Sequence, residues 1–424
     1  MRSLLFDLCR AGLIMGLTIS AASAGDWTEF RGPTGQGISD ARDLPIHWSE
    51  TENVAWKRAV PGLGWSSPVV AGGRVFLTTA IPKEPGPGHS LRVLCLDPES
   101  GETLWDVEAF DQPVGERVEK HQKNSHASPT PLVEGDHLYV HFGPHGTACL
   151  NAENGALVWK NQEIAYAPNH GNGGSPALAG DKLVICCDGR DVQFVLGLNK
   201  HTGEIAWKTD RGVHAQKGFS FSTPLVLEVQ GRPQAICPGS GGVIAYDPDT
   251  GEEIWRVRYG EGYSVVPRPV FGAGLVFVCS GFGDERLLAI DPAGKGDVTD
   301  SHVKWTLDRG APKSPSALVV GDELYCVDDN GIASCVDSRS GQVFWQRRLG
   351  GNYSASPLFA GGNVYFQDEN GKAAVIRAST TYEEVSRNTL AGDERTFASY
   401  AVHEGALLVR SEGHLYRIGR PRPR

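Results

Sequence analysis

The sequence lacks an excess of basic residues and, after residue 24, it lacks any long hydrophobic run. Its formal net charge is −10, its pI is about 5.7 and charged residues make up 21% of the chain. A negatively charged chain offers no basic field to nucleic acid or to an anionic membrane, so we expect neither as a partner. Without a second long apolar run, the sequence predicts no membrane-spanning segment in the mature chain.

The sequence also lacks the short motifs of several enzyme classes. It contains no Gly-x-Ser-x-Gly elbow, no Walker-type phosphate loop and no His-Glu-x-x-His helix. Four histidines, His121, His126, His170 and His214, are not spaced as the ligands of a compact metal site. We therefore predict no metal site, and a metal-dependent hydrolase or lyase at these histidines is one alternative.

The N-terminus has the layout of an export signal. Arginines accompany an apolar run over residues 11–20, and small residues at 22–24 form a cleavage site. The run is too short for a stable membrane anchor. We predict a signal peptide over residues 1–24, a mature chain that starts near Gly25, and a periplasmic or secreted location.

Nine cysteines would be enough for a disulfide framework, but their positions favour packing. Cys95, Cys149 and Cys335 occupy one repeat position that Ala245 and Ala289 fill in other repeats. A cysteine in such a position behaves as a small buried hydrophobic residue. We therefore assign these cysteines to the core.

The tryptophans mark a repeat with a spacing of about 40 to 54 residues. Each strong copy has Asp or Asn, glycine four residues later and tryptophan eight residues later. These copies are 97–105, 151–159, 199–207, 247–255 and 337–345. A sixth copy, 291–305, has a longer turn, and a seventh, near 377–385, has neither the glycine nor the tryptophan.

A second signature precedes each copy: a Ser-Pro or Thr-Pro step, an apolar run, a tight turn and another apolar run. The steps are Ser67-Pro68, Ser128-Pro129, Ser175-Pro176, Thr223-Pro224, Arg268-Pro269, Ser314-Pro315 and Ser356-Pro357, and Ser399 begins an eighth without proline. Together the two signatures predict four antiparallel strands per repeat, A to D, with tight turns from A to B and from C to D. Four such strands form one blade of a β-propeller.

The count of strands predicts how the ring closes. Eight A–B units occur, but only seven D strands follow a C strand, and residues 53–60 with Trp56 have the pattern of the missing D strand. We predict an all-β, eight-bladed propeller in which this N-terminal strand completes the last blade, with seven blades as the alternative. The expected divisions are an N-terminal extension over 25–47, the propeller over 48–419 and a basic tail over 420–424. We expect a monomer.

The tryptophan repeats resemble those of the pyrroloquinoline-quinone (PQQ) propeller family. In that family the indole of one blade packs against the next blade, and the resemblance assigns this structural role to Trp56, Trp105, Trp159, Trp207, Trp255, Trp305 and Trp345. Residues 26–39 and 48–57 are similar to the start of small secreted PQQ-like repeat proteins. The resemblance implies two functions: quinoprotein dehydrogenases with PQQ and calcium, or a cofactor-free protein-binding propeller like that of the outer-membrane barrel-assembly machinery.

One face of the predicted ring carries the longer loops. The B–C loops and the D-to-A connections share this face, which we call the loop face, and the short A–B and C–D turns share the other, the turn face. Binding residues concentrate on loops held by a rigid scaffold. The candidate ligand-binding residues on the loop face are Trp65, His121, Lys123, Asn124, His126, Asn169, His170, Asn172, His214, Lys217, Phe219, Tyr263, Arg268, Lys313 and Tyr353.

These residues do not match the needs of a PQQ site, which uses carboxylate and amide ligands for calcium, an aspartate base and an arginine. Nearby carboxylates and arginines are Asp188, Asp191, Asp284, Asp328, Arg190 and Arg268. The adjacent Cys186 and Cys187 resemble the vicinal disulfide that covers PQQ in some alcohol dehydrogenases, but here they end a B strand. The leading hypothesis is a binding or scaffold module for a protein segment or a glycan. The alternative is a PQQ- and calcium-dependent oxidoreductase.

Overall fold

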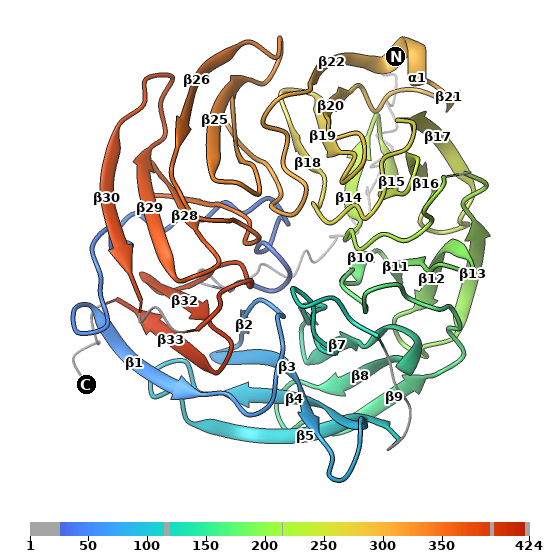
Figure 1. Ribbon diagram of the computed structural model, residues 1–424. Helices are drawn as coiled ribbons and strands as arrows, with labels where there is room; N and C mark the ends of the chain where they lie inside the picture. The colour runs from blue at the N-terminus through green and yellow to red at the C-terminus, as the bar shows by residue number, and fades with distance from the viewer. Residues whose placement is uncertain (1–25, 114–118, 214, 391–393, 420–424) are drawn as a thin grey trace, which may run out of the picture.

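The computed structural model describes residues 26–113, 119–213, 215–390 and 394–419. These residues form a closed ring of eight sheets, which are the blades of a propeller (Figure 1). The prediction of an all-β, eight-bladed ring is confirmed, and the seven-bladed alternative is wrong. The predicted signal peptide and the basic tail lie outside the described residues.

Within each blade the strands run from the axis outward in the order A, B, C, D. Blade one contains β2 (Val69–Ala71), β3 (Arg74–Pro82), β4 (His89–Leu96) and β5 (Thr103–Gln112); blade two contains β6 (Leu132–Glu134), β7 (His137–His141), β8 (Thr147–Asn151) and β9 (Leu157–Asn161). Blade three contains β10 (Ala177–Ala179), β11 (Lys182–Asp188), β12 (Gln193–Asn199) and β13 (Ile205–Asp210); blade four contains β14 (Leu225–Val229), β15 (Arg232–Gly239), β16 (Gly242–Tyr246) and β17 (Glu253–Arg258).

The second half of the ring repeats the same order. Blade five contains β18 (Val270–Gly272), β19 (Leu275–Cys279), β20 (Leu287–Ile290) and β22 (Val303–Leu307); blade six contains β23 (Leu318–Val320), β24 (Glu323–Val327), β25 (Ile332–Asp337) and β26 (Val343–Arg348). Blade seven contains β27 (Leu358–Ala360), β28 (Asn363–Gln367), β29 (Lys372–Arg377) and β30 (Glu384–Thr389); blade eight contains β31 (Ala401–His403), β32 (Ala406–Arg410), β33 (His414–Ile418) and β1 (Val54–Ala59).

Three short elements lie outside this pattern. The strand β21 (Gly296–Asp297) pairs in parallel with β17 at the edge of blade four. Single helical turns are η1 (Gly143–His145) and α1 (Thr299–His302). The helices in the described part of the chain are therefore far too short to cross a membrane.

The N-terminal strand closes the ring, as predicted. The sheet order of blade eight is β1-β33-β32-β31, and Trp56 of β1 lies opposite Arg417 of β33. Figure 1 shows the blue β1 alongside the red β33, so the two ends of the chain meet in one sheet. Pairing β1 with β33 covers an edge of blade eight that would otherwise expose unpaired backbone groups.

Six of the seven outer indoles donate to a carbonyl in the C–D turn of the following blade, whereas the Trp255 indole donates to Gln234 of its own blade. The Trp56 indole N–H donates to the Pro98 carbonyl at 3.0 Å, and a Cβ added to Gly101 would lie 2.9 Å from the indole ring. Gly101 also has a φ of +70°, so the turn needs glycine for both its conformation and its close approach. The same contact recurs between Trp159 and Gly203.

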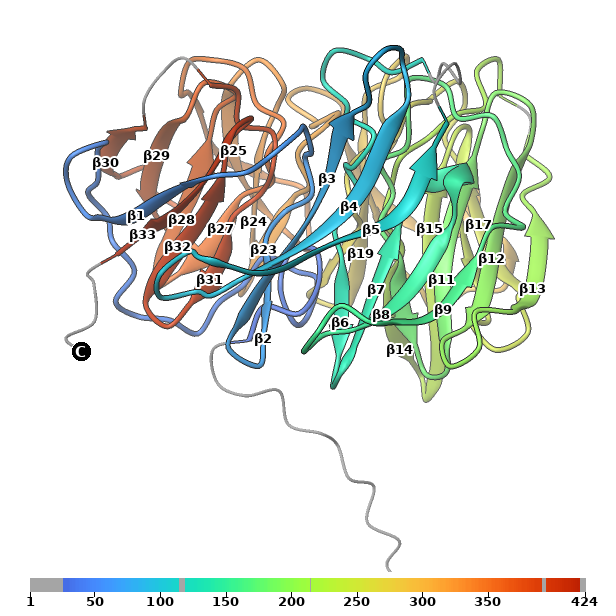
Figure 2. The same ribbon diagram turned by 90° about the horizontal axis from the view of Figure 1, so that it is seen from below.

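Residues 26–40, which we call the plug, cross the ring near the turn face, and residues 41–47 continue along blade seven to its outer strand, where the Ile46 carbonyl accepts from Asn388 at 3.0 Å. Trp27 exchanges backbone hydrogen bonds with Val70 of blade one, and the Thr28 carbonyl accepts from blade two. Gly37 accepts from Phe359 of blade seven at 2.8 Å. Figure 2 shows this blue segment along the lower edge of the ring. The plug therefore closes one end of the central channel.

Candidate functional site

A belt of serine and threonine hydroxyls surrounds the axis just above the plug. In six blades the backbone N–H of the belt residue donates to the belt hydroxyl of the next blade. The bonds are Ser67 to Thr130 (3.0 Å), Thr130 to Ser175 (2.8 Å), Ser175 to Thr223 (3.0 Å), Ser316 to Ser356 (3.0 Å), Ser356 to Ser399 (2.9 Å) and Ser399 to Ser67 (3.0 Å). In blade five Arg268 takes the position, and its N–H donates to Ser316 at 2.9 Å.

The belt corrects the sequence alignment in two blades. The equivalent residue is Thr130 in blade two and Ser316 in blade six, each two residues after the Ser-Pro step that the sequence singled out. Ser128 and Ser314 instead bond locally, Ser128 to Asn124 and Ser314 to Asp329. A serine before proline is therefore not by itself the mark of the belt position.

A cavity of about 570 Å³ lies above the belt, and we call it the cup. Phe30 of the plug lines the cup, the belt hydroxyls surround it, and residues of the D-to-A connections line its upper part. Because those connections belong to the loop face and the plug lies toward the turn face, the cup opens at the loop face.

Aromatic side chains form an arc on one side of the cup. Phe219 contacts Phe221 and Tyr263, with ring centroids 5.9 and 5.7 Å apart. Tyr263 contacts Phe282 in turn, at 6.5 Å. The Lys217 ammonium lies 4.3 Å from the Tyr263 ring centroid and donates to its hydroxyl at 3.1 Å. The arc offers an apolar surface with a cation at its edge.

Charged groups also line the cup, and Lys313 lies beside the arc, with its ammonium 5.1 Å from the Phe282 ring centroid. Lys123 contacts Glu369 at 2.7 Å. The Asp329 carboxylate accepts from the backbone N–H of Lys313 at 2.8 Å and from the Ser314 hydroxyl at 2.6 Å. The first bond links the connection before blade two to a loop of blade seven, and the others join two loops of blade six and occupy the Asp329 carboxylate oxygens.

Two histidines from successive connections meet at the rim. The rings of His121 and His170 lie 5.5 Å apart, and the backbone N–H of His121 donates to the His170 carbonyl. The Asn124 amide donates to the same carbonyl at 2.9 Å. Burial lowers the pKa of His121, and the charges of His170 and Lys123 lower it further. The neutral imidazole of His121 is thus favoured near neutral pH.

The structure brings about half of the predicted site residues together. Those that line the cup are Trp65, His121, Lys123, Asn124, His170, Phe219, Tyr263 and Lys313. The others do not line it: His126, Asn169, Asn172, Lys217, Arg268 and Tyr353. His214 lies outside the described residues.

The residues that do not line the cup have other contacts. Arg268 is directed toward the plug, where it meets Glu29 at 3.1 Å and the Phe30 carbonyl at 2.7 Å. Tyr353 is buried between blades six and seven, and the His126 ring lies 4.1 Å from that of His89. The sequence predicts all three at the mouth, which is wrong, because the position in the sequence determines the connection on which a residue lies but not the direction of its side chain.

Several cup residues were not anticipated from the sequence. They are Phe30, Phe221, Phe282, Asp329, Asn330, Asn352, Ser354, Phe397 and the belt hydroxyls. The sequence does contain a signal for the belt, because each belt residue lies two positions before an A strand. Nothing in the repeat pattern marks Phe30, which belongs to the N-terminal extension.

The cup does not have the donor set of a PQQ and calcium site. Asp329 is the carboxylate among the cup-lining residues that the structure describes, and it is already engaged with Lys313 and Ser314. Asp188 forms a buried ion pair, and Asp191 accepts from the Ala167 N–H at 2.8 Å. Calcium requires several free oxygen ligands.

The adjacent cysteines also do not form a cofactor cover. Cys186 and Cys187 are reduced and buried in β11. Cys187 packs with Tyr166 toward blade two, and Cys186 packs with Cys237 toward blade four. Successive side chains of a strand point to opposite faces of the sheet, which explains the separation.

Comparisons with known proteins agree with the fold. The sequence profile of the family described as outer membrane protein assembly factor BamB matches residues 89–347 and 195–420. The chain is 23% identical over 242 residues to the BamB of Shewanella oneidensis, covering 52% of this chain and 56% of that protein. It is 29% identical over 149 residues to subunit 1 of the methanol dehydrogenase of Methylorubrum extorquens, covering 30% and 22%. The chain thus spans little more than half of the first of these curated relatives and about a fifth of the second.

Two solved structures share the architecture. BamB from Moraxella catarrhalis matches with a TM-score of 0.61 at 15% identity, over 88% of this chain and 98% of that one. The quinohemoprotein alcohol dehydrogenase from Comamonas testosteroni matches with a TM-score of 0.68 at 12% identity, over 96% and 82%. At such identities both likenesses concern the fold alone. Because the family profile extends from blade one to the last strand of the ring, this chain belongs to the outer membrane protein assembly factor BamB family.

Proposed function

We propose that this protein is an exported binding module whose ligand, a segment of another protein, enters the cup from the loop face. The observation that carries the proposal is the cup itself, a cavity of about 570 Å³ with Phe30 at the plug end and aromatic and hydrogen-bonding groups around it. Cavities of this size that combine apolar walls with a few polar groups are typical of binding sites. We expect a periplasmic or secreted location because of the predicted signal peptide over residues 1–24. N-terminal sequencing of the purified protein tests whether this segment is removed.

The cup presents hydrogen-bond donors that have no protein acceptor. The Trp65 indole N–H is buried and finds no acceptor among the described residues. The belt hydroxyls accept backbone bonds, and for their own hydrogens the described residues supply no acceptor. Buried donors are costly unless they are paired, so they favour an acceptor-rich ligand such as backbone carbonyls or a carboxylate.

The aromatic arc complements these donors. Phe219, Tyr263 and Phe282 offer stacked or edge contacts to an apolar side chain, and a peptide supplies both such side chains and carbonyl acceptors. Membership in a family described as assembly factors also favours a protein ligand over a glycan. A glycan with several acceptor oxygens is the alternative occupant.

A binding screen with matched variants tests the proposal. The purified protein is screened against a displayed peptide library and a glycan array, and the selected ligand is measured by calorimetry. We expect Tyr263→Ala to weaken peptide binding by more than about ten-fold, as for an aromatic hot spot. Leu157→Ala, on the exposed outer strand β9, should leave binding unchanged. Binding that survives Tyr263→Ala, or selection of glycans only, would contradict the proposal for a protein segment.

The same preparation distinguishes the oxidoreductase alternative. Addition of PQQ and calcium chloride, followed by absorbance and reduction of an electron-accepting dye with alcohols, measures binding and turnover. We expect neither PQQ binding nor turnover, because the Asp329 carboxylate already accepts hydrogen bonds from Lys313 and Ser314. Stoichiometric PQQ binding with turnover would replace the binding-module proposal by a quinoprotein dehydrogenase.

A further inference from the structure

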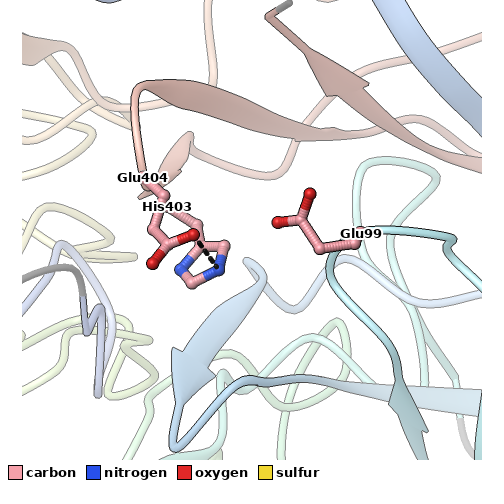
Figure 3. Close-up of side chains that lie close together, drawn as sticks. All are labelled: Glu99, His403 and Glu404. Atoms are coloured by element: carbon pink, nitrogen blue, oxygen red, sulfur yellow. Dashed lines mark ion pairs between the residues drawn. The ribbon is translucent and has the colours of Figure 1, made fainter. Parts of the chain in front are cut away.

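A histidine and two glutamates meet on the turn face where blade eight adjoins blade one. His403 ends β31, Glu404 follows it in the turn to β32, and Glu99 lies in the turn between β4 and β5. One ligand atom from each lies within 4.8 Å of the other two. Figure 3 shows the carboxylates of Glu99 and Glu404 on either side of the His403 imidazole.

We propose that these three side chains bind one divalent transition-metal ion, which links blade eight to blade one. Zinc accepts imidazole nitrogen and carboxylate oxygen at roughly 2.0–2.2 Å, so its tetrahedral ligand atoms lie roughly 3.3 Å apart. The present separations need only modest rotations of two exposed glutamate side chains to reach that geometry. Water completes the fourth position of such a site.

The charges around the cluster suit a divalent cation. Arg417, which is 1% exposed, holds one oxygen of Glu99 at 3.0 Å, and the Glu99 carboxylate contributes one atom to the cluster with His403 and Glu404. A partner that holds one oxygen of a ligating carboxylate also orients the ligand. The Asp43 carboxylate adds negative charge at the same turn, because a Cβ on Gly405 would lie 3.0 Å from its Oδ2. These three carboxylates lie near two guanidiniums, Arg417 and Arg58, whose Nε donates to the Ser100 carbonyl of the same turn at 3.0 Å, and the remaining negative charge attracts a cation.

The position gives the ion a structural role. Blade eight is built from both ends of the chain: the chain runs on from β1 into blade one, but only noncovalent contacts hold β31, β32 and β33 to β1 and to blade one. Trp56 of β1 already packs on Gly101, which belongs to the same turn as Glu99. An ion held between that turn and the β31–β32 turn would strengthen this seam, because a ligand that binds only the folded state raises its stability.

The test uses the full chain after dialysis against EDTA. Zinc chloride is titrated while the thermal unfolding midpoint and the heat of binding are measured. We expect one ion per chain, a raised midpoint, and no comparable effect of calcium chloride, because imidazole favours transition metals. His403→Gln and Glu404→Gln should each lower the zinc affinity by at least about ten-fold.

A matched control separates this site from other surface histidines. His137, which pairs with Asp136 at the A–B turn of blade two, is changed to glutamine and should leave zinc binding intact. If His403→Gln does not fold, the exposed Glu404→Gln variant decides the outcome. A zinc response that is absent from the parent, or that persists unchanged in Glu404→Gln, would overturn the proposal.

Discussion

Trp48 stacks on Tyr365, with ring centroids 6.4 Å apart and planes inclined by 17°. In blade six the tyrosine at the same place, Tyr325, contacts Trp345 of its own outer strand. Blade seven has no tryptophan in β30, so an indole from the N-terminal part of the chain fills the vacant position. The backbone N–H of Trp48 also donates to the Asn388 side chain of β30 at 2.9 Å.

Replacing Trp48 by alanine should therefore destabilise the ring as strongly as loss of a repeat tryptophan. Truncation of a buried aromatic residue costs about 3–5 kcal/mol of the free energy of unfolding. Urea denaturation measured by circular dichroism gives this value. Leu157→Ala, at an exposed position, serves as the control and should change little. A loss for Trp48→Ala no larger than that of the control would show that blade seven does not use this indole.

Loss of the buried ion pair between Asp188 and Arg211 should also lower the free energy of unfolding strongly. Arg211 meets Asp188 at 2.8 Å and donates to the Cys237 carbonyl of blade four at 2.9 Å. Burial opposes the charge on Arg211, but Asp188 outweighs it and keeps the pKa of Arg211 above its ordinary value.

Changing Asp188 to asparagine leaves a buried guanidinium without a counter-charge. We expect a loss of about 3–5 kcal/mol in the free energy of unfolding. Asp284→Asn, which removes an exposed partner of Arg286, is the matched control and should cost less than about 1 kcal/mol. Equal effects of the two changes in urea denaturation would contradict the assigned role of the buried pair.

The pH dependence of stability should contain a contribution from His126. Burial, and then the charge of His89, lower the pKa of His126 from 6.5 to about 4. The unfolded chain therefore binds a proton at this position before the folded chain does, and the stabilisation is lost as pH falls from 6.5 toward 4.

The His126→Gln variant should lack this part of the loss of stability at low pH. The free energy of unfolding, measured in urea between pH 7 and pH 4.5, should fall less steeply than in the parent. His137→Gln, at a partly exposed histidine, is the control and should retain the slope of the parent. A variant slope equal to that of the parent would mean that His126 is protonated alike in both states.

The features that recur in every blade could be predicted because the same sequence pattern appears in each repeat. The tryptophans and the Ser-Pro steps fixed the four-stranded blade, and the unmatched segment around Trp56 predicted the closing strand. Trp48 gave no such signal, because it replaces an indole in blade seven from more than three hundred residues away along the chain. Such a contact depends on ring closure and not on local sequence.

The candidate site was predictable only at the level of its loops. The D-to-A connections line the cup as expected, since strand direction determines the face on which a loop lies. Arg268 and Tyr353 show the limit of this prediction. The Arg268 side chain points to the plug, and Tyr353 is buried in the core between two blades. The plug itself carries no repeat, so the position of Phe30 could not be derived from the period.

The cup is most directly tested as the ligand site by crosslinking. A photoreactive residue in place of Asn352, which is exposed and lines the cup, is irradiated with the peptide selected in the binding screen. The same residue in place of Leu157 on the outer strand is the control. The account predicts a specific crosslink from position 352 and none from position 157. A crosslink only from position 157 would contradict it.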